Sequence, residues 1–484
     1  MSTPTFAIVG HPNKGKSSLV ATLARDASVR IGPEPGTTVH AREFPMRAGG
    51  KVLYTLVDTP GFQRARAALD WLKQHDTSAG SRADIVAQFV QTHEHEDRYR
   101  NECELLRPVI AGAGLIYVVD GATPYGPEYD AEMEILRWTG QPSLAVINPI
   151  GEPRFVEPWR RALEQFFRVV RVLDVMKAPF DQQLELLRAF GQLRETWRQP
   201  LEEAVTALIE HRERQSADAA RVIVDMIAEA LGHQETKDLS QGEDPTRHAA
   251  SLESKYQRRL RAIEAQARRD VETLYGFDEL DREEVDMTLL ETDLLSKESW
   301  LIFGLKKRDL VVVSATGGAI AGGVVDSALL GASFLTGSLV GGVIGGAIGY
   351  FSSSKLADLK LLRQPMGGVR LRYGPSRNVQ FPFVLLNRAL LHHTVVEGRT
   401  HAQRGALTIR DGNAAAMEAV QFVGDSTREL ARLFDRLRRS EPGTEARAAA
   451  LTALTEEVRK LMALQDESSR DQQGSDTPLL GSGQ

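Results

Sequence analysis

The sequence has almost no cysteine and little excess charge of either sign. Cys103 is the only cysteine among 484 residues, which excludes an internal disulfide framework and suits a reducing compartment. The chain has 59 lysines and arginines against 65 aspartates and glutamates, and its net charge of −6 argues against a protein that coats nucleic acid through bulk charge. The apolar fraction of 42% and the charged fraction of 26% are those of a folded globular protein. We therefore expect a folded, cytoplasmic protein of about two to four domains.

Residues 1–180 alternate short apolar runs with helical stretches. Nearly continuous apolar runs are typical of strands buried on both faces of a largely parallel sheet, with helices as right-handed crossovers. The pattern predicts an α/β domain in which a mostly parallel sheet is flanked by helices. The expected strands are 6–9, 52–57, 115–119, 144–147 and 169–173.

A phosphate-binding motif follows the first of these expected strands. Residues 10–17 read Gly-His-Pro-Asn-Lys-Gly-Lys-Ser and match G-x-x-x-x-G-K-[ST] between a predicted strand and a predicted helix. Glycines let backbone N–H groups curl around phosphate oxygens, and the helix N-terminus adds the positive end of its dipole. We expect Lys16 to reach the β- and γ-phosphates and the hydroxyl of Ser17 to bind Mg²⁺.

Two further motifs follow in the order that a phosphate-binding loop requires. Residues 36–38 read Gly-Thr-Thr in a Pro/Gly-rich loop, where a threonine can bind Mg²⁺ when a γ-phosphate orders the loop. Residues 58–61 read Asp-Thr-Pro-Gly at the end of an expected strand. There, Asp58 suits a Mg²⁺ contact through water, and the amide of Gly61 could bond the γ-phosphate.

With these motifs, the sequence resembles the translation-factor-related P-loop GTPases of the Era, TrmE and FeoB branch. Residues 13–19, 35–38 and 58–61 carry the resemblance, which covers residues 1–180. The whole layout also resembles a bacterial group of predicted GTPases with an uncharacterised C-terminal domain. The resemblance implies a P-loop G domain that binds GTP and GDP with Mg²⁺ and hydrolyses GTP.

The resemblance also assigns roles to individual residues. It implies that Lys16, Thr38 and Gly61 act in catalysis, and Asn13 matches the asparagine that helps hold K⁺ in some members. The residues that it implies for nucleotide binding are Asn13, Lys14, Gly15, Lys16, Ser17, Ser18 and Asn148. Those that it implies for the metal are Ser17, Thr38 and Asp58.

The sequence departs from the family pattern at two places. Phe62 stands where Ras-like proteins carry the catalytic glutamine, and an apolar side chain cannot orient a water. We therefore expect slow hydrolysis without a partner or K⁺. Residues 148–151 read Asn-Pro-Ile-Gly in place of Asn-Lys-x-Asp, so the carboxylate contact to guanine, worth about 1.5–3 kcal/mol, is missing. Specificity for guanine over adenine stays open, with Glu152 and Asp174 as candidate acceptors.

A helical insertion is expected at residues 63–110, where small GTPases have a shorter segment. We expect it to offer a nucleotide-sensing surface to a partner. It contains His93-Glu94-His95-Glu96, which we interpret as a solvated helix face, because alternate residues of a helix point about 200° apart.

The remaining sequence divides into four regions that differ in composition. We expect a charged helical region at 181–300, a Gly-rich apolar hairpin at 301–352, a helical region at 353–465 and a disordered tail at 466–484. Glycines recur every four residues from Gly337 to Gly349, a spacing that lets helices approach closely. Residues 310–351 carry no charged side chain apart from Asp326, and about 25 residues suffice to cross a bilayer. Lipid contact and a buried hairpin in a soluble domain both remain open.

The leading hypothesis is a slow GTPase that acts as a nucleotide-dependent switch at the cytoplasmic face of a membrane. One alternative is a dynamin-like protein that remodels or tethers membranes, in which G domains could form a homodimer. Another is a nucleotide-binding scaffold with relaxed base specificity. Nucleic acid is not an expected partner, because the arginines near 257–269 sit among acidic residues on a helix and are interpreted as a solvated face.

Overall fold

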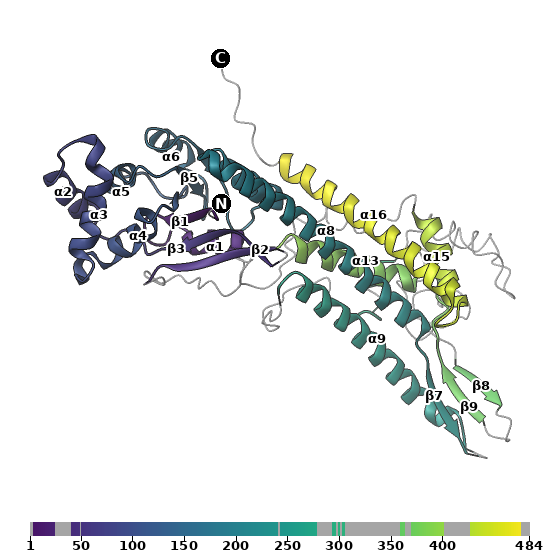
Figure 1. Ribbon diagram of the computed structural model, residues 1–484. Coiled ribbons are helices and arrows are strands. Elements are labelled where there is room, and N and C mark those ends of the chain that lie inside the picture. Colours follow the sequence, from purple (N-terminus) through teal and green to yellow (C-terminus); the bar gives the residue numbers. More distant parts are fainter. Residues whose placement is uncertain are drawn as a thin grey trace. The chain divides into compact units, whose positions relative to one another are not determined.

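The computed structural model (Figure 1) contains two compact units. Buried hydrophobic residues form two clusters in unit 1 and one in unit 2. Unit 1 comprises Met1–Arg214 and Gly398–Arg404, and unit 2 comprises Gln215–Glu397 and Gly405–Gln484. Unit 1 thus extends beyond residue 180, where we expected the first domain to end. The residues that the structure describes are 3–24, 40–48, 50–240, 243–277, 293–296, 299–300, 303–304, 359–363, 369–400 and 426–475.

Unit 1 is built on a six-stranded sheet with the strand order β2-β3-β1-β4-β5-β6. All neighbouring strands are parallel except β2, which pairs antiparallel with β3 at the edge. The five expected strands are present, whereas β2 is an addition that the sequence pattern did not indicate. The strands are β1 (Thr5–Val9), β2 (Arg42–Ala48), β3 (Lys51–Asp58), β4 (Gly114–Asp120), β5 (Ser143–Asn148) and β6 (Val170–Val172).

Helices cover both faces of this sheet, because successive residues of a strand face opposite sides. Phe6 and Ile8 of β1 lie in one core with α1, α7 and the first turns of α8. Ala7 and Val9 lie in the other core, with α2 to α6. The helices are α1 (Lys16–Ala24), α2 (Ala65–Gln74), α3 (Arg82–His93), α4 (Arg100–Ile110), α5 (Pro127–Trp138), α6 (Val156–Leu163), α7 (Phe180–Gly191) and α8 (Glu195–Gly232).

Three helices, α2, α3 and α4, fill the stretch between β3 and β4, together with the 3₁₀ turns Ala79–Ser81 and Asp97–Tyr99. His93 at the end of α3 is not a solvated side chain as we expected. It is buried against the rings of Trp71, Phe89 and Tyr99. Among the described residues, no cluster of histidine, cysteine and carboxylate side chains could hold a metal ion.

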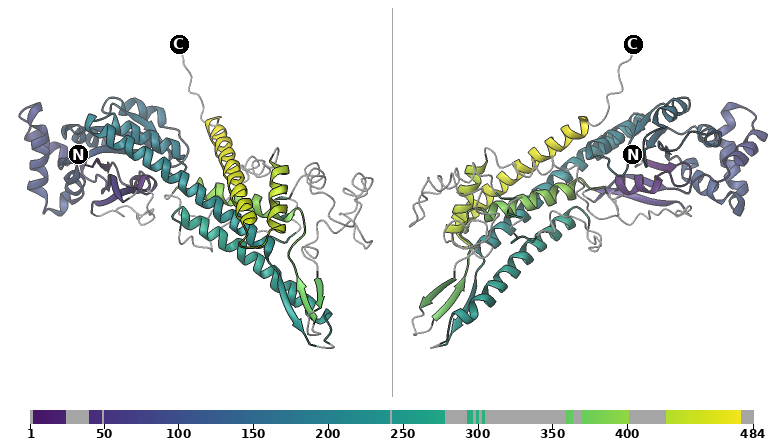
Figure 2. Two further views of the ribbon diagram at one scale, coloured as in Figure 1. Left: turned by 45° about the vertical axis from the view of Figure 1, so that its right-hand side comes forward. Right: turned by 180° about the vertical axis from the view of Figure 1, so that it is seen from behind.

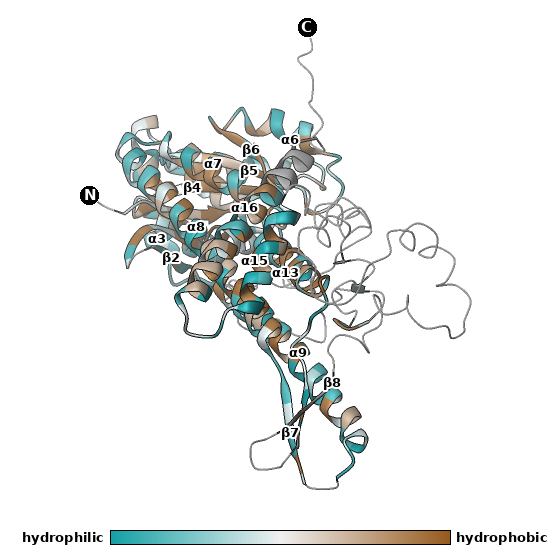
Figure 3. Ribbon diagram, turned by 90° about the vertical axis from the view of Figure 1, so that its right-hand side faces the viewer, coloured by the Kyte–Doolittle hydropathy of each residue, from teal (hydrophilic) through white to brown (hydrophobic). Residues whose placement is uncertain are grey.

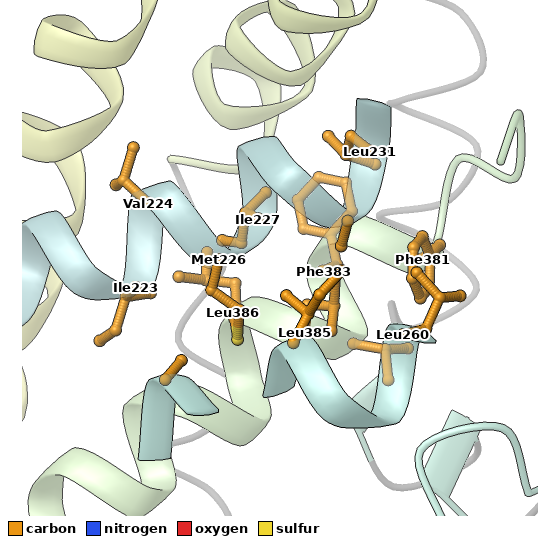
Figure 4. Packing of buried hydrophobic residues seen from close by; sticks show 14 of the residues in the cluster. Ile223, Val224, Met226, Ile227, Leu231, Leu260, Phe381, Phe383, Leu385 and Leu386 are labelled. Carbon is orange, nitrogen blue, oxygen red and sulfur yellow. The ribbon is translucent and has the colours of Figure 1, made fainter. Parts of the chain in front are cut away.

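Unit 2 is mostly helical and also contains a small antiparallel sheet with the order β7-β9-β8 (Figure 2). Its core joins the C-terminal half of α8 to the next helices, and Figure 4 shows Ile227 of α8 beside Phe383 and Leu386 of α13. The elements are β7 (Glu235–Leu239), α9 (Thr246–Leu274), β8 (Leu359–Arg363), β9 (Val369–Tyr373), α13 (Phe381–Glu397), α15 (Thr427–Arg439) and α16 (Glu445–Ser475).

Amphipathic patterns explain why the helices of unit 2 pack as they do. The apolar stripe of α9, which runs from Leu252 to Val271, is buried in the core. Most of the remaining positions are hydrophilic, and Figure 3 shows both kinds along α9 and α15. Helix α16 (Glu445–Ser475) continues through residues 466–475, where we expected a disordered tail.

Two of the sequence expectations fall outside the described residues. Thr38 is one of them, and the Gly-rich hairpin is the other, apart from Phe303 and Gly304. Within the described part of the chain, none of the helices combines the length and the apolarity that a membrane span requires.

Candidate nucleotide-binding site

The phosphate-binding motif forms the loop between β1 and α1. Strand β1 lies between β3 and β4, where the strand order reverses, and this is where α/β sheets bind ligands. The backbone curls at Gly10, Asn13 and Gly15, which have φ angles of 140°, 59° and 86°. A Cβ atom at Gly10 would lie 2.5 Å from the carbonyl oxygen of Val118, so this position requires glycine. The loop therefore has the geometry that turns N–H groups toward a phosphate.

Lys16 begins α1, and its side chain is buried beside the loop. Its Nζ atom donates a hydrogen bond to the carbonyl oxygen of His11 at 2.9 Å. Burial lowers the pKa of Lys16 to about 8, although the charges of Asp58 and Glu132 act in the opposite direction. A desolvated ammonium group at this position gains more from a phosphate than an exposed one would.

Two predicted metal ligands come together at the carboxyl end of the sheet. The hydroxyl of Ser17, in the first turn of α1, donates to Oδ2 of Asp58 at 2.8 Å. Asp58 ends β3 and is buried, and Ser18 follows Ser17 on the helix. Hydroxyl and carboxylate oxygens suit Mg²⁺, which also takes ligands from substrate phosphates and water.

The Asp-Thr-Pro-Gly segment, residues 58–61, passes close to the phosphate-binding loop. A Cβ atom at Gly61 would lie 2.5 Å from the backbone nitrogen of Pro12, so the two segments touch through their backbones. The N–H group of Phe62 donates to the carbonyl oxygen of Gly10 at 3.3 Å. The ring of Phe62 is buried in the core with α2 to α6 and therefore cannot position a water.

Asn148 at the end of β5 connects the phosphate-binding loop to the loop after β6. Its Nδ2 atom donates to the carbonyl oxygen of Lys14 at 3.3 Å, and its Oδ1 atom accepts the N–H group of Val175 at 3.1 Å. The side chain of Lys14 turns to β4, where Nζ donates to Thr123 at 3.0 Å and lies 3.6 Å from Asp120. Asn148 thus keeps a positioning role in a motif that has lost its carboxylate.

The two candidate acceptors for a base differ in their surroundings. The side chain of Asp174 is 32% exposed, lies 3.5 Å from Nζ of the exposed Lys177, and is next to Val175, whose N–H group bonds to Asn148. The side chain of Glu152 is 71% exposed and pairs with Arg154. Asp174 is therefore the better-placed carboxylate beside the Asn148 loop.

A buried carboxylate beside the phosphate-binding loop was not predicted from the sequence. Glu132 of α5 accepts from the hydroxyl of Tyr117 at 2.9 Å and lies 2.8 Å from Nδ1 of His11. Burial raises the pKa of Glu132. The sequence could have indicated that Glu132 is buried, because it stands beside an apolar stripe. Tyr129, Met133 and Leu136 form this stripe, three or four residues apart on one face of α5.

Comparison with known proteins gives matches for both parts of the chain. Residues 5–120 match a family described as 50S ribosome-binding GTPase, and residues 160–463, well over half of the chain, match the family described as domain of unknown function DUF3482. A solved structure of Era, in complex with MgGDPNP and part of 16S ribosomal RNA, covers 57% of this chain and 90% of its own, at 15% identity and a TM-score of 0.27.

The curated relatives each match a limited share of the chain. GTPase Der of Nitrosococcus oceani is 31% identical over 118 residues, which are 24% of this chain and 25% of that protein. GTPase Der of an Azoarcus species is 51% identical over 61 residues, or 13% and 14% of the two chains. The chain thus spans about a quarter or less of the length of these relatives. The protein belongs to the DUF3482 family, and its N-terminal domain is a P-loop GTPase domain of the kind found in Der.

Proposed function

We propose that this protein is a nucleotide-dependent switch that binds GTP and GDP with Mg²⁺ and hydrolyses GTP slowly. The observation that carries the proposal is the meeting of Lys16, Ser17 and Asp58 at the carboxyl end of the sheet. Lys16 supplies the charge for the β- and γ-phosphates, and the Ser17–Asp58 pair supplies oxygens for Mg²⁺. Thr38 is proposed as the further metal ligand that a γ-phosphate orders.

The proposal of slow hydrolysis is supported by the position of Phe62. Its ring is buried in the core, so this position supplies no group that could orient the attacking water. The water must then be positioned by Gly61, by K⁺ held near Asn13 or by a group from a partner. The family that residues 5–120 match is described as ribosome-binding. This description does not support our expectation that nucleic acid is not a partner.

GTP turnover should depend on the Ser17–Asp58 pair. We expect the Ser17→Ala variant to lose most Mg²⁺-dependent turnover, because the hydroxyl that donates to Asp58 at 2.8 Å is also the proposed metal ligand. Phosphate release with Mg²⁺ and with EDTA, in K⁺ and in Na⁺ buffers, measures the effect. The matched control is Ser143→Ala at the start of β5. Turnover in Ser17→Ala equal to that of the wild type would contradict the assignment.

We propose Asp174 as the carboxylate that contacts guanine. Replacing Asp174 with asparagine should weaken GDP binding about tenfold and leave ATP binding unchanged, since a bond to a charged acceptor is worth about 1.5–3 kcal/mol. Glu152→Gln is the control, because Glu152 is exposed and paired with Arg154. A loss of GDP affinity in Glu152→Gln but not in Asp174→Asn would transfer the role to Glu152.

A scaffold that binds nucleotide without hydrolysing it is the second candidate, and Gly151, in place of the base-binding aspartate, favours it. Turnover that Ser17→Ala removes would exclude this candidate. The proposals of lipid contact and of dynamin-like remodelling depend on residues 309–351, which lie outside the described part of the chain.

A further inference from the structure

The loop after β6, residues 173–179, is held in place by buried side chains from other elements. Asn148 of β5 accepts the N–H group of Val175, as described above. The carbonyl oxygen of Val175 accepts a hydrogen bond from the hydroxyl of Thr22 of α1 at 3.1 Å. Val175 itself has an exposed fraction of 0%. The backbone beside Asp174, the proposed guanine contact, is thus fixed from both α1 and β5.

A third bond to this loop comes from a residue 224 positions further along the chain. The hydroxyl of Thr400 donates to the carbonyl oxygen of Met176 at 3.0 Å. Thr400 is only 3% exposed and Arg399 only 8%, so this short segment is packed into unit 1, to which residues 398–400 belong. A buried hydroxyl normally has a hydrogen-bond partner, and here the partner is the loop that carries Asp174.

Thr400 stands close to a point where the chain passes from unit 2 to unit 1. Helix α13 ends at Glu397, which belongs to unit 2, and Gly398 already belongs to unit 1. Residues 398–400 therefore connect the end of α13 covalently to the bond with Met176. Three residues of chain span at most about 11 Å, so a movement at one end of this connection is transmitted to the other.

The chain passes between the units within α8 as well, after Arg214. Two residues earlier, the guanidinium carbon of Arg212 lies 4.6 Å from the ring centroid of Phe180. Phe180 begins α7, directly after the loop that follows β6. Residues next to two of the chain's passages between the units therefore contact the loop or the helix turn that follows it.

We propose that Thr400 is a positioning residue of the nucleotide-binding site, through which the end of α13 responds to the bound base. This inference rests on the proposed function, in which Asp174 contacts guanine. A base that orders the loop favours the bond between Met176 and Thr400. The bond in turn favours the loop conformation that binds the base, because coupling between two binding events is reciprocal.

The first test compares GDP with ATP on the full chain. Thr400→Val keeps the shape of the side chain but removes the hydroxyl, and it should bind GDP about fivefold more weakly than the wild type and ATP within about twofold. Thr400→Ser keeps the hydroxyl and should recover most of the loss. The matched control is Thr139→Val, because Thr139 is also buried in unit 1 and its hydroxyl donates to the carbonyl oxygen of Leu136 at 2.6 Å.

Hydrogen exchange measured by mass spectrometry gives a readout that a merely structural role would not change. In the wild type, GDP should slow exchange at the amides of residues 394–400 by about fivefold or more. Thr400→Val and Asp174→Asn should lose this response at saturating GDP, whereas Thr139→Val should keep it.

Three outcomes would overturn the inference. They are Thr400→Val binding GDP as tightly as Thr139→Val does, an equal loss of GDP and ATP affinity with a lower melting temperature, and wild-type exchange at residues 394–400 that does not respond to GDP. A wild type that binds no nucleotide would instead overturn the proposed function, so the two failures are distinguishable.

Discussion

Replacing Lys16 with alanine should lower the affinity for GTP and GDP at least about a hundredfold. The ammonium is buried beside the loop, and two charge-assisted bonds to phosphate oxygens are worth about 3 kcal/mol or more. Titration with fluorescent guanine nucleotides measures the loss. Lys51→Ala is the matched control, because Lys51 is exposed and pairs with Glu203 at 2.9 Å in the same unit. Equal affinities in Lys16→Ala and the wild type would contradict the role.

The pH dependence gives the same prediction a second readout. The pKa of Lys16 is lowered to about 8 by burial, so raising the pH above 8 removes the charge in the free protein. Phosphate binding requires the protonated form, and affinity should therefore fall by up to about tenfold per pH unit above that value. The Lys16→Ala variant should not show this fall.

Replacing Arg388 with alanine should cost unit 2 about 3–5 kcal/mol of its free energy of unfolding. The guanidinium of Arg388 is buried, with Nε donating to Glu264 at 2.6 Å and Nη1 donating to Ser299 at 2.8 Å. Burial acts to raise the pKa of Glu264, but Arg268 and Arg388 outweigh it and hold this pKa below its usual value. Without Arg388, a buried carboxylate would lose a main counter-charge. Urea unfolding followed by circular dichroism measures the change.

The control for Arg388 is an arginine in an exposed ion pair of the same unit. Arg259 donates to Glu229 at 2.6 Å, and both side chains are about half exposed. Arg259→Ala should cost less than about 1 kcal/mol. A loss of that size in Arg388→Ala would show that the buried pair adds little to the stability of unit 2.

The sequence predicts the parts of the site that depend on local rules. The phosphate-binding loop needs glycine where the backbone adopts a positive φ, as at Gly10, and a lysine at the start of a helix, so the spacing alone identifies it. The strands next to it are apolar on both faces, so their sequence pattern predicts them. The sequence of β2 lacks such a pattern, because this strand pairs on one side only and contains Pro45, which an edge strand tolerates.

The buried carboxylates could not be placed in the same way. Glu102 and Glu132 stand among apolar helix positions, but a single sequence does not show which backbone N–H group or hydroxyl a carboxylate will meet. Those partners come from segments far along the chain, such as Gln63 for Glu102 and Tyr117 for Glu132. The boundary of unit 1 could not be predicted from the sequence either. It falls within α8, where no proline or glycine interrupts the helical pattern near Arg214.

The most direct test of the proposed switch is calorimetric titration of the wild-type protein with GDP, GTP and ATP, with Mg²⁺ in K⁺ buffer. We expect Mg²⁺-dependent binding of both guanine nucleotides, at least about tenfold tighter than that of ATP, if Asp174 supplies the guanine contact that we propose for it. Equal affinity for ATP would show that the site binds nucleotides through their phosphates alone, and no binding of any nucleotide would contradict the proposed function.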